Sequence, residues 1–169
     1  SYAPITFTGT VTAATGNGLL NGSIDVSGVL GGSGGYTYSW SNGAITQDLT
    51  GLSAGDYSLI VSDSNGCNSA SVSFEVTEPE ELTVSISETN SIVCNAGTGE
   101  LTASGDGGIL GSGYSYTWYE VGNSSSIGTG TTLNRVAGDY YVVITDKSNP
   151  VNTTTSSVFK LEEPTPVTF

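Results

Sequence analysis

The chain has 169 residues, 24 of them glycine, and three basic side chains against 16 acidic ones give it a net charge of −13. Nucleic-acid binding depends on clustered Lys and Arg that neutralise phosphates, and an anionic membrane surface attracts the same residues. The basic residues are few and far apart in the sequence, and no run approaches the roughly 18 consecutive apolar residues of a membrane span. We therefore expect no nucleic-acid partner and no membrane insertion.

Short strands are predicted along the chain, beginning with one that opens after Pro4. Trp40 lies in the third strand by our count, and apolar and polar residues then alternate over residues 57–62 and 72–76. Alternation with period 2 is the signature of a half-buried strand. Tight turns are predicted where Asn and Gly adjoin, because both residues tolerate positive φ; these pairs occupy positions 17–18, 21–22, 42–43 and 65–66.

The same order of motifs then recurs, which makes an internal repeat the main signal of the sequence. The repeated segments are residues 22–28 with 99–105, residues 36–40 with 114–118, and residues 54–63 with 137–146. Strand alternation continues in the second copy at residues 82–86, 140–145 and 158–161. The spacing between the copies grows across residues 119–132, which we interpret as an insertion on a surface loop.

Prolines mark the boundaries of the repeat. Pro4, Pro79 and Pro164 each precede the first residues of a strand. We therefore expect a first domain over residues 1–79 and a second over residues 80–169, with the last residues beginning a third. This organisation indicates a piece of a longer array.

Two features narrow the fold class. Several short strands in about 80 residues predict an antiparallel sandwich, and immunoglobulin-like sandwiches bury a mid-domain Trp, where Trp40 and Trp118 stand. They also carry a tyrosine corner, in which a Tyr hydroxyl bonds to the backbone a few residues upstream. Tyr57 follows Leu52 in this manner, whereas the second copy has Arg135 in place of that leucine, so its corner is expected to pack differently. We expect an all-β chain with two tandem immunoglobulin-like antiparallel β-sandwich domains.

A family resemblance is carried by residues 34–79, which read GGYTYSWSNGAITQDLTGLSAGDYSLIVSDSNGCNSASVSFEVTEP. This segment resembles the SprB-type repeats of surface adhesins in gliding bacteria. The similarity rests on Tyr-x-Tyr-x-Trp followed by Ala-Gly-x-Tyr and Asp-x-Asn-Gly-Cys; it is close over residues 22–79 and looser over residues 99–164. The resemblance implies a secreted, surface-attached multidomain protein, and it supplies no catalytic residues.

The cysteines depart from the pattern of that family. Its repeats often carry one Cys near the end of the first strand and another after Asp-x-Asn-Gly. The first repeat here keeps only Cys67 and the second only Cys94, so neither can form an internal disulfide. A bridge between the two would need Cα atoms within about 7 Å; the simpler expectation is two free, mostly buried thiols.

Enzymatic activity is not expected. The chain has no His, so Ser–His and Cys–His nucleophile systems are absent and zinc catalysis would be unusual. A carboxylate pair of the glycosidase type remains formally available. However, the paired acids lie at the junctions between repeats rather than in an obvious cleft; they are Glu78, Glu80, Glu81, Glu162 and Glu163.

Calcium binding is the alternative use of the acidic residues. Ca²⁺ takes roughly six to eight oxygen ligands, and the candidates are the junction acids Glu78, Glu80 and Glu81 together with the loop residue Asp106. The segment 63–66 superficially resembles the start of a calcium loop but lacks its further acidic ligands. It reads more simply as a turn in which Asp63 and Asn65 bond to their own backbone. No other cofactor is expected.

Three side chains are candidates for contact with a ligand. Tyr119 extends its motif and is expected to be exposed. Leu30 and Leu110 are apolar residues in glycine-rich loops, and the loops of sandwiches commonly carry binding. The competing interpretation, which we favour for the loops, is that their apolar side chains fold back over the core.

These features favour a structural and adhesive module, one link in a long, acidic surface adhesin that serves as a stalk in attachment or gliding. Its expected location is the outside of a bacterial cell. The expected partners are neighbouring repeats of the same chain and surface polysaccharide, and the isolated piece is expected to be a monomer. The alternative is a lectin-like module that itself binds polysaccharide, with or without Ca²⁺.

Overall fold

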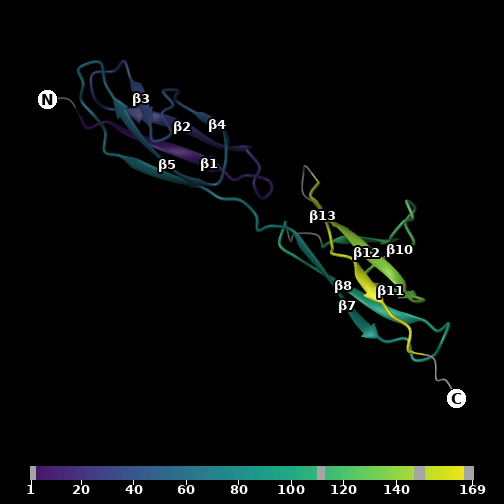
Figure 1. The fold of residues 1–169 in the computed structure, drawn as a ribbon. Coiled ribbons are helices and arrows are strands. Elements are labelled where there is room, and N and C mark those ends of the chain that lie inside the picture. Colours follow the sequence, from purple (N-terminus) through teal and green to yellow (C-terminus); the bar gives the residue numbers. More distant parts are fainter. Residues whose placement is uncertain (1–2, 110–112, 147–150, 166–169) are drawn as a thin grey trace. The chain divides into compact units, whose positions relative to one another are not determined.

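The computed structural model describes residues 3–109, 113–146 and 151–165. The secondary structure of these residues consists of strands (Figure 1). The described part of the chain therefore contains no helix that could cross a membrane. The chain divides into two compact units, Ser1–Pro79 and Glu80–Phe169. The expected beginning of a third repeat falls largely on residues 166–169, outside the described residues.

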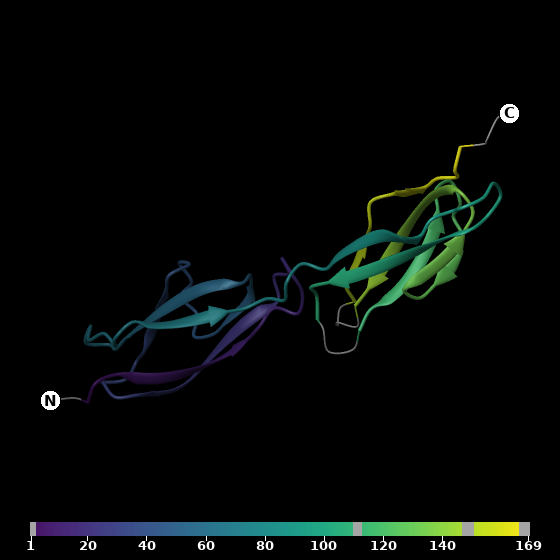
Figure 2. The same ribbon diagram turned by 90° about the horizontal axis from the view of Figure 1, so that it is seen from below.

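The described residues of the first unit form two antiparallel sheets of three strands each. One sheet has the order β1 (Thr6–Thr12), β2 (Gly22–Leu30), β4 (Leu49–Leu52). The other has the order β3 (Thr37–Trp40), β5 (Gly55–Ser62), β6 (Val72–Val76). Figure 2 shows this unit from the side, with the purple β1 in one layer and the teal strands of the other sheet facing it.

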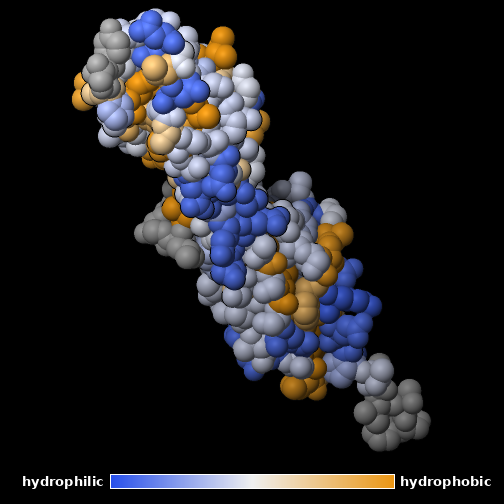
Figure 3. Space-filling view, turned by 90° about the vertical axis from the view of Figure 1, so that its left-hand side faces the viewer, coloured by the Kyte–Doolittle hydropathy of each residue, from blue (hydrophilic) through white to orange (hydrophobic). Residues whose placement is uncertain are grey.

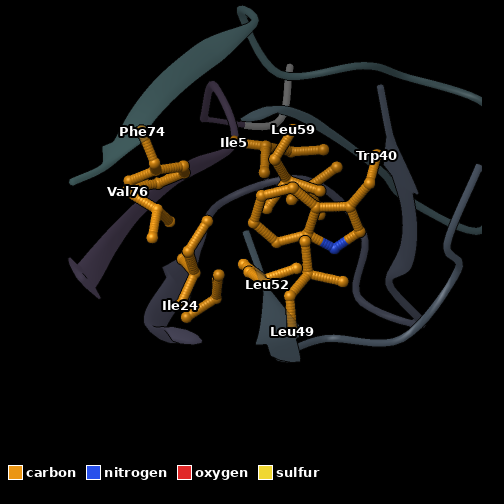
Figure 4. Close-up of a cluster of buried hydrophobic side chains, with 10 residues drawn as sticks. Ile5, Ile24, Trp40, Leu49, Leu52, Leu59, Phe74 and Val76 are labelled. Carbon is orange, nitrogen blue, oxygen red and sulfur yellow. The ribbon is translucent and has the colours of Figure 1, made fainter. Parts of the chain in front are cut away.

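The core of the first unit fills the space between its two sheets. Alternate residues of β2 and β5 point into it, and Ile24, Leu59 and Val61 have no exposed surface. The indole of Trp40 lies at the centre of the cluster (Figure 4) and is tilted against the ring of Phe74 at a centroid distance of 5.9 Å. The period-2 alternation in the sequence thus corresponds to one inward and one outward face on each strand.

The second unit repeats this plan with additional short strands. One sheet has the order β11 (Thr132–Arg135), β8 (Gly99–Asp106), β7 (Thr83–Asn90). The other has the order β10 (Gly128–Thr129), β9 (Ser115–Glu120), β12 (Gly138–Thr145), β13 (Thr153–Thr155), and β14 (Phe159–Leu161) also pairs with β12. The predicted insertion at residues 119–132 contains β10, which pairs with β9 and widens this sheet.

The strand order confirms the expected fold class of immunoglobulin-like antiparallel sandwiches. In each unit the first two strands share a sheet with the strand that precedes the tyrosine corner. The third strand shares the other sheet with the strands that follow the corner. This is the partition of strands A, B and E against C, F and G in the immunoglobulin fold. Each unit encloses its own buried cluster between these sheets.

The two residue-level features expected of this fold are present in both units. Trp40 is 4% exposed and Trp118 is fully buried. The Tyr57 hydroxyl donates to the Ser53 carbonyl at 3.1 Å, and the Tyr140 hydroxyl donates to the carbonyl four residues upstream at 3.0 Å. Both tyrosine corners are therefore formed.

The second corner packs differently, as the substitution of leucine by arginine predicts. In the first unit Leu52 is buried at this position. In the second unit Arg135 is only partly buried, and its guanidinium donates a hydrogen bond to the Ile127 carbonyl. The insertion thus supplies the acceptor that allows a charged side chain to replace a core leucine.

Candidate functional site

A buried aspartate lies beside the glycine-rich loop of the first unit. Asp63 follows β5 and is 5% exposed. One of its carboxylate oxygens, Oδ2, accepts the Ser33 N–H of the loop at 2.9 Å. The other, Oδ1, accepts the N–H groups of Asn65 and Cys67 at 3.0 and 2.8 Å, so this segment is a turn around its own aspartate, as predicted. The carboxylate therefore ties the loop between β2 and β3 to the turn after β5.

The second unit builds the same feature, which we call the aspartate clamp in both units. Asp146 follows β12 and is 1% exposed. Its Oδ2 accepts the Ile109 N–H at 3.1 Å, and its Oδ1 accepts the Asn152 N–H at 3.1 Å. A carboxylate buried at this depth requires such donors, because an unpaired charge would be strongly destabilising. The clamp explains why an aspartate ends this strand in both copies.

Glycines make the close approach in the first unit possible. A Cβ on Gly32 would lie 2.8 Å from Asp63 Oδ2, and a Cβ on Gly31 would lie 2.1 Å from the Pro4 carbonyl oxygen. The Gly32 N–H donates to the Ala3 carbonyl at 2.8 Å. The loop is thus packed between the start of the unit and the aspartate clamp, which makes it a structural element of the fold.

The predicted ligand residues of the glycine-rich loops have different positions. Leu30 is 66% exposed, whereas its neighbour Val29 packs against the core. In the second unit Ile109 is 37% exposed and Leu110 lies outside the described residues. The fold-back interpretation thus holds for Val29, whereas Leu30 presents its side chain to solvent. Such side chains, orange in Figure 3, are interspersed with polar ones on the face shown.

Tyr119 is half-buried and stacks on Tyr141, which the sequence did not pair with it. The two residues are directly opposite on β9 and β12. Their ring centroids are 5.2 Å apart and their planes differ by 13°. They lie on the outer face of this sheet, since Trp118, Tyr140 and Val142 between and beside them point into the core. The pair is an aromatic surface feature of the second unit.

The junction acid Glu78 holds a turn of its own unit. Its carboxylate accepts the Gly18 N–H at 2.7 Å and the Asn17 side-chain amide at 3.4 Å. That amide also donates to the Pro79 carbonyl at 3.2 Å. Residues at the end of the first unit are therefore fastened to the loop between β1 and β2.

The second unit has an equivalent brace at the same place. The Glu163 carboxylate accepts the Ala96 N–H at 3.1 Å. Ala96 has a φ of 60°, in the left-handed region that favours glycine, and the first unit has Gly18 with a φ of 69° at the matching turn. The recurrence of a carboxylate on this turn shows that one acid of each junction has a structural partner.

The other acids of the predicted calcium site belong to the second unit. Glu80 and Glu81 are exposed at the start of the second unit, and Asp106 is exposed at the end of β8, where its Oδ1 accepts the Gly107 N–H at 2.9 Å. Among the described residues, no group of three or more Asp, Glu or Cys side chains is arranged to hold a metal ion. The calcium site stays a prediction, and thermal melts in EDTA and in millimolar CaCl₂ test it, because a cation bound to the native state raises Tm.

Both cysteines are free, and both are exposed. The expectation of free thiols is met, whereas the expectation that they are mostly buried is wrong. Cys67 lies in the turn around Asp63, where its backbone N–H donates to the Asp63 carboxylate and its carbonyl accepts the Asp63 N–H. Cys94 lies in the turn between β7 and β8. Both turns run over the surface of their unit, where a thiol can remain exposed.

A serine with a structural role in each unit was not recognised in the sequence. The Ser69 hydroxyl accepts the Val61 N–H, and the Ser156 hydroxyl accepts the Val142 N–H, both at 3.0 Å. Each hydroxyl then donates to the carbonyl of the next residue at 2.8 Å. These serines complete the hydrogen bonding of a central strand where its edge partner is irregular. Serine is frequent in this sequence, so composition alone carries no signal for them.

Acid pH is expected to weaken the aspartate clamp of the first unit. Hydrogen bonds from the backbone N–H groups of Cys67 and Ser33 lower the pKa of Asp63, although desolvation opposes them. A lowered folded-state pKa means that this stabilisation is present above the unfolded pKa of about 4 and is lost as the pH falls through the folded pKa. We expect Asp63→Asn to lower Tm by on the order of 5 °C at neutral pH.

The measurement is a set of thermal melts of the wild type and Asp63→Asn between neutral and acid pH. The difference in Tm should be constant above about pH 5 and should shrink below about pH 4. Asp25→Asn is the matched control, since Asp25 is an exposed residue of β2. A difference that stays constant into acid would show that the ionised carboxylate contributes nothing.

The comparison with family models confirms the resemblance to SprB-type repeats. Residues 8–45 match the model of the SprB repeat. SprB repeats are modules of gliding-motility surface adhesins, which implies a cell-surface location and a module of a non-catalytic kind. No curated protein matches the chain.

Three of the solved structures that match the chain do so at low sequence identity and with TM-scores below 0.5. The three N-terminal domains of the bacteriophage RB49 highly immunogenic outer capsid protein (Hoc) are 17% identical, with a TM-score of 0.48 over 92% of this chain and 58% of that one. A Dscam structure is 13% identical, with a TM-score of 0.41 over 97% of this chain and 47% of that one. The human OSCAR ligand-binding domain is 13% identical, with a TM-score of 0.43 over 94% and 100%. The chain thus spans less than two thirds of the first two structures.

Proposed function

We propose that this chain is a pair of structural and adhesive repeats in a large secreted adhesin, and that it serves as a link of an extended stalk in bacterial surface attachment or gliding. The match of residues 8–45 to the SprB repeat supports this proposal. So does the architecture, in which one sandwich plan recurs with its own core in each unit. Neighbouring repeats of the same chain are the proposed partners.

The observation that carries the proposal is how the junction residues are bound. Thr77 accepts the Ala14 N–H through its carbonyl at 2.9 Å, and Glu78 and Pro79 accept hydrogen bonds from the loop that contains Asn17. On the other side of the boundary, the Glu80 carbonyl accepts the Gly108 N–H of the second unit at 2.9 Å. The residues on the two sides of the boundary, from Thr77 to Glu80, thus each bond within their own unit.

Repeats that follow each other at short junctions suit a stalk, because each repeat of a tandem array contacts only its neighbours. The acidic composition adds a short-range electrostatic repulsion. Like charges along an array oppose its collapse, although salt screens this repulsion over about 8 Å at physiological ionic strength. The chain carries a net charge of −13, so neighbouring repeats repel where they are not in contact.

We expect the two units to tumble together in solution. The measurement is ¹⁵N relaxation of the whole chain, from which a rotational correlation time is obtained for each unit. The control inserts a Gly-Ser linker of about ten residues between Pro79 and Glu80, which should give each unit a shorter, independent correlation time. Independent tumbling of the wild-type units would overturn the proposed link.

The surface role has a separate test in cells. Antibodies against this chain should label intact, unpermeabilised cells of the source bacterium. Deletion of residues 1–169 from the parent protein should reduce attachment or gliding while the remainder is still exported. A chain detected only after permeabilisation would contradict the proposed location.

A further inference from the structure

The outer face of the larger sheet in the second unit combines aromatic, hydroxyl and aliphatic side chains. Residues opposite each other on antiparallel strands share a face. Tyr119 lies opposite Tyr141, and Val143 lies between Thr117 on β9 and Thr155 on β13. We call the surface formed by these five side chains the tyrosine face.

The first unit provides an internal comparison for this face. Its sheet places Ser39 opposite Ile60, where the second unit has Thr117 opposite Val143. At the positions of the two tyrosines it has Ser41 and Ser58, and the Ser58 N–H donates to the Ser41 hydroxyl at 3.0 Å. A hydroxyl residue and an aliphatic residue thus recur in both units, whereas the tyrosine pair occurs in the second.

The fold itself does not require the tyrosines. A cross-strand aromatic pair stabilises a sheet by up to about 1 kcal/mol, but the first unit forms the same sheet with serines. Both rings are only half-buried, and neither belongs to the hydrophobic core cluster of its unit. The pair is therefore a surface specialisation of the second repeat.

The chemistry of the tyrosine face suits a sugar polymer. The C–H groups on the face of a pyranose ring carry a slight positive charge, and they pack against the negative face of an aromatic ring. Tyrosine adds a hydroxyl at its tip, and Thr117 and Thr155 supply neutral donors and acceptors beside the rings. Such surfaces give large contact area at little entropic cost, since a tyrosine has two side-chain torsions.

The charge of the chain and the size of the tyrosine face distinguish between its possible ligands. The five side chains are uncharged. Beside them on this sheet, Asp139 lies opposite Lys160, and the Lys160 ammonium forms an ion pair with Glu162 at 3.0 Å. The net charge of −13 repels a polyanion and a second copy of the chain alike. A stable protein interface also needs about 20–30 residues a side, far more than this face offers. A neutral polysaccharide is not repelled by the charge, and it does not need an interface of that size.

We propose that the tyrosine face of the second unit binds a neutral polysaccharide through Tyr119 and Tyr141. This inference goes beyond the proposed link function and does not depend on it. The first unit, with serines in place of the tyrosines, does not bind the same ligand. The pair of repeats thus combines a plain link with a link that holds a glycan.

The test is affinity electrophoresis of the whole chain in gels that contain laminarin, dextran or xyloglucan as neutral polymers, or alginate as a polyanion. At least one neutral polymer should retard the wild type. Tyr119→Ser with Tyr141→Ser, which copies the first unit, should weaken that binding by about tenfold or more. Ser41→Ala with Ser58→Ala changes the matching positions of the first unit and should leave binding unchanged.

Three outcomes would overturn the proposal. They are no retardation by any of the neutral polymers, equal retardation of the wild type and the tyrosine double variant, and retardation by alginate alone. A melt of the double variant shows whether the second unit is still folded. If it is not, the wild type decides: ring proton resonances of Tyr119 and Tyr141 should shift on addition of a retarding oligosaccharide, and unshifted resonances would refute the assigned face.

Discussion

Trp118→Ala is expected to unfold the second unit while the first unit keeps its melting temperature. Trp118 has no exposed surface, and its indole N–H donates to the Gly130 carbonyl at 2.9 Å. Replacing a buried Trp with Ala costs about 3–5 kcal/mol, a large share of the roughly 5–15 kcal/mol that stabilises a typical domain. The first unit has a separate core around Trp40 and loses no contact.

The two tryptophans make this result measurable. Each unit contains one, so the fluorescence of Trp118→Ala reports only on Trp40 and the first unit. Its thermal transition should match that of the wild type, while calorimetry should show a lowered or missing transition for the second unit. Trp118→Phe is the control and should lose less stability, because it keeps most of the buried volume. A common shift of both transitions would contradict separate cores.

Gly31→Ala is expected to destabilise the first unit more than Gly34→Ala in the same loop. Both glycines have positive φ, 85° and 81°, so alanine at either position carries the left-handed strain of about 1–2 kcal/mol. A Cβ at position 31 would also lie 2.1 Å from the Pro4 carbonyl oxygen, whereas nothing lies within 4 Å of one at position 34. The backbone contact cannot be relieved by a side-chain rotation, and overpacking of this kind adds about 1–3 kcal/mol.

Urea unfolding of the two variants measures the difference directly. Because the two φ values are nearly equal, the backbone strain is the same in both variants. The additional loss in the free energy of unfolding of Gly31→Ala therefore measures how tightly the segment around Pro4 is packed against the loop. The same contact recurs at Gly107, where a Cβ would lie 1.9 Å from the Glu81 carbonyl oxygen. Equal losses for the two alanine variants would mean that the segment around Pro4 shifts at little cost.

The local features of the fold could be predicted because they depend on residues that are close together in the sequence. Period-2 alternation marked the inward side chains of β5 and β12, and Tyr57 and Tyr140 revealed the corners through a hydrogen bond that spans only four residues. The turn at Asp63 was likewise recognisable, since an aspartate bonds to N–H groups a few positions ahead. For these features the sequence neighbours are also the spatial neighbours.

Other features depend on segments far apart in the chain. Ser33 and Asp63 form the clamp across 30 positions, and Gly18 meets Glu78 across 60. The exposure of Cys67 was predicted wrongly because a thiol is buried by preference, while its turn is held at the surface by the backbone. The residue types at these positions do not indicate which distant residue each of them contacts.

The sequence by itself determined an all-β repeat with two tryptophan-centred cores and its likeness to SprB repeats, because alternation, turn residues and motif recurrence are local and periodic. Only the tertiary structure decided which residues meet. The strand register places Tyr119 directly opposite Tyr141. The folding of the loops brings the Glu78 carboxylate to the Gly18 N–H and the Asp63 carboxylate to the glycine-rich loop. A one-residue change of register reverses every side chain of a strand, so surfaces built across strands become visible only once the sheets are assembled.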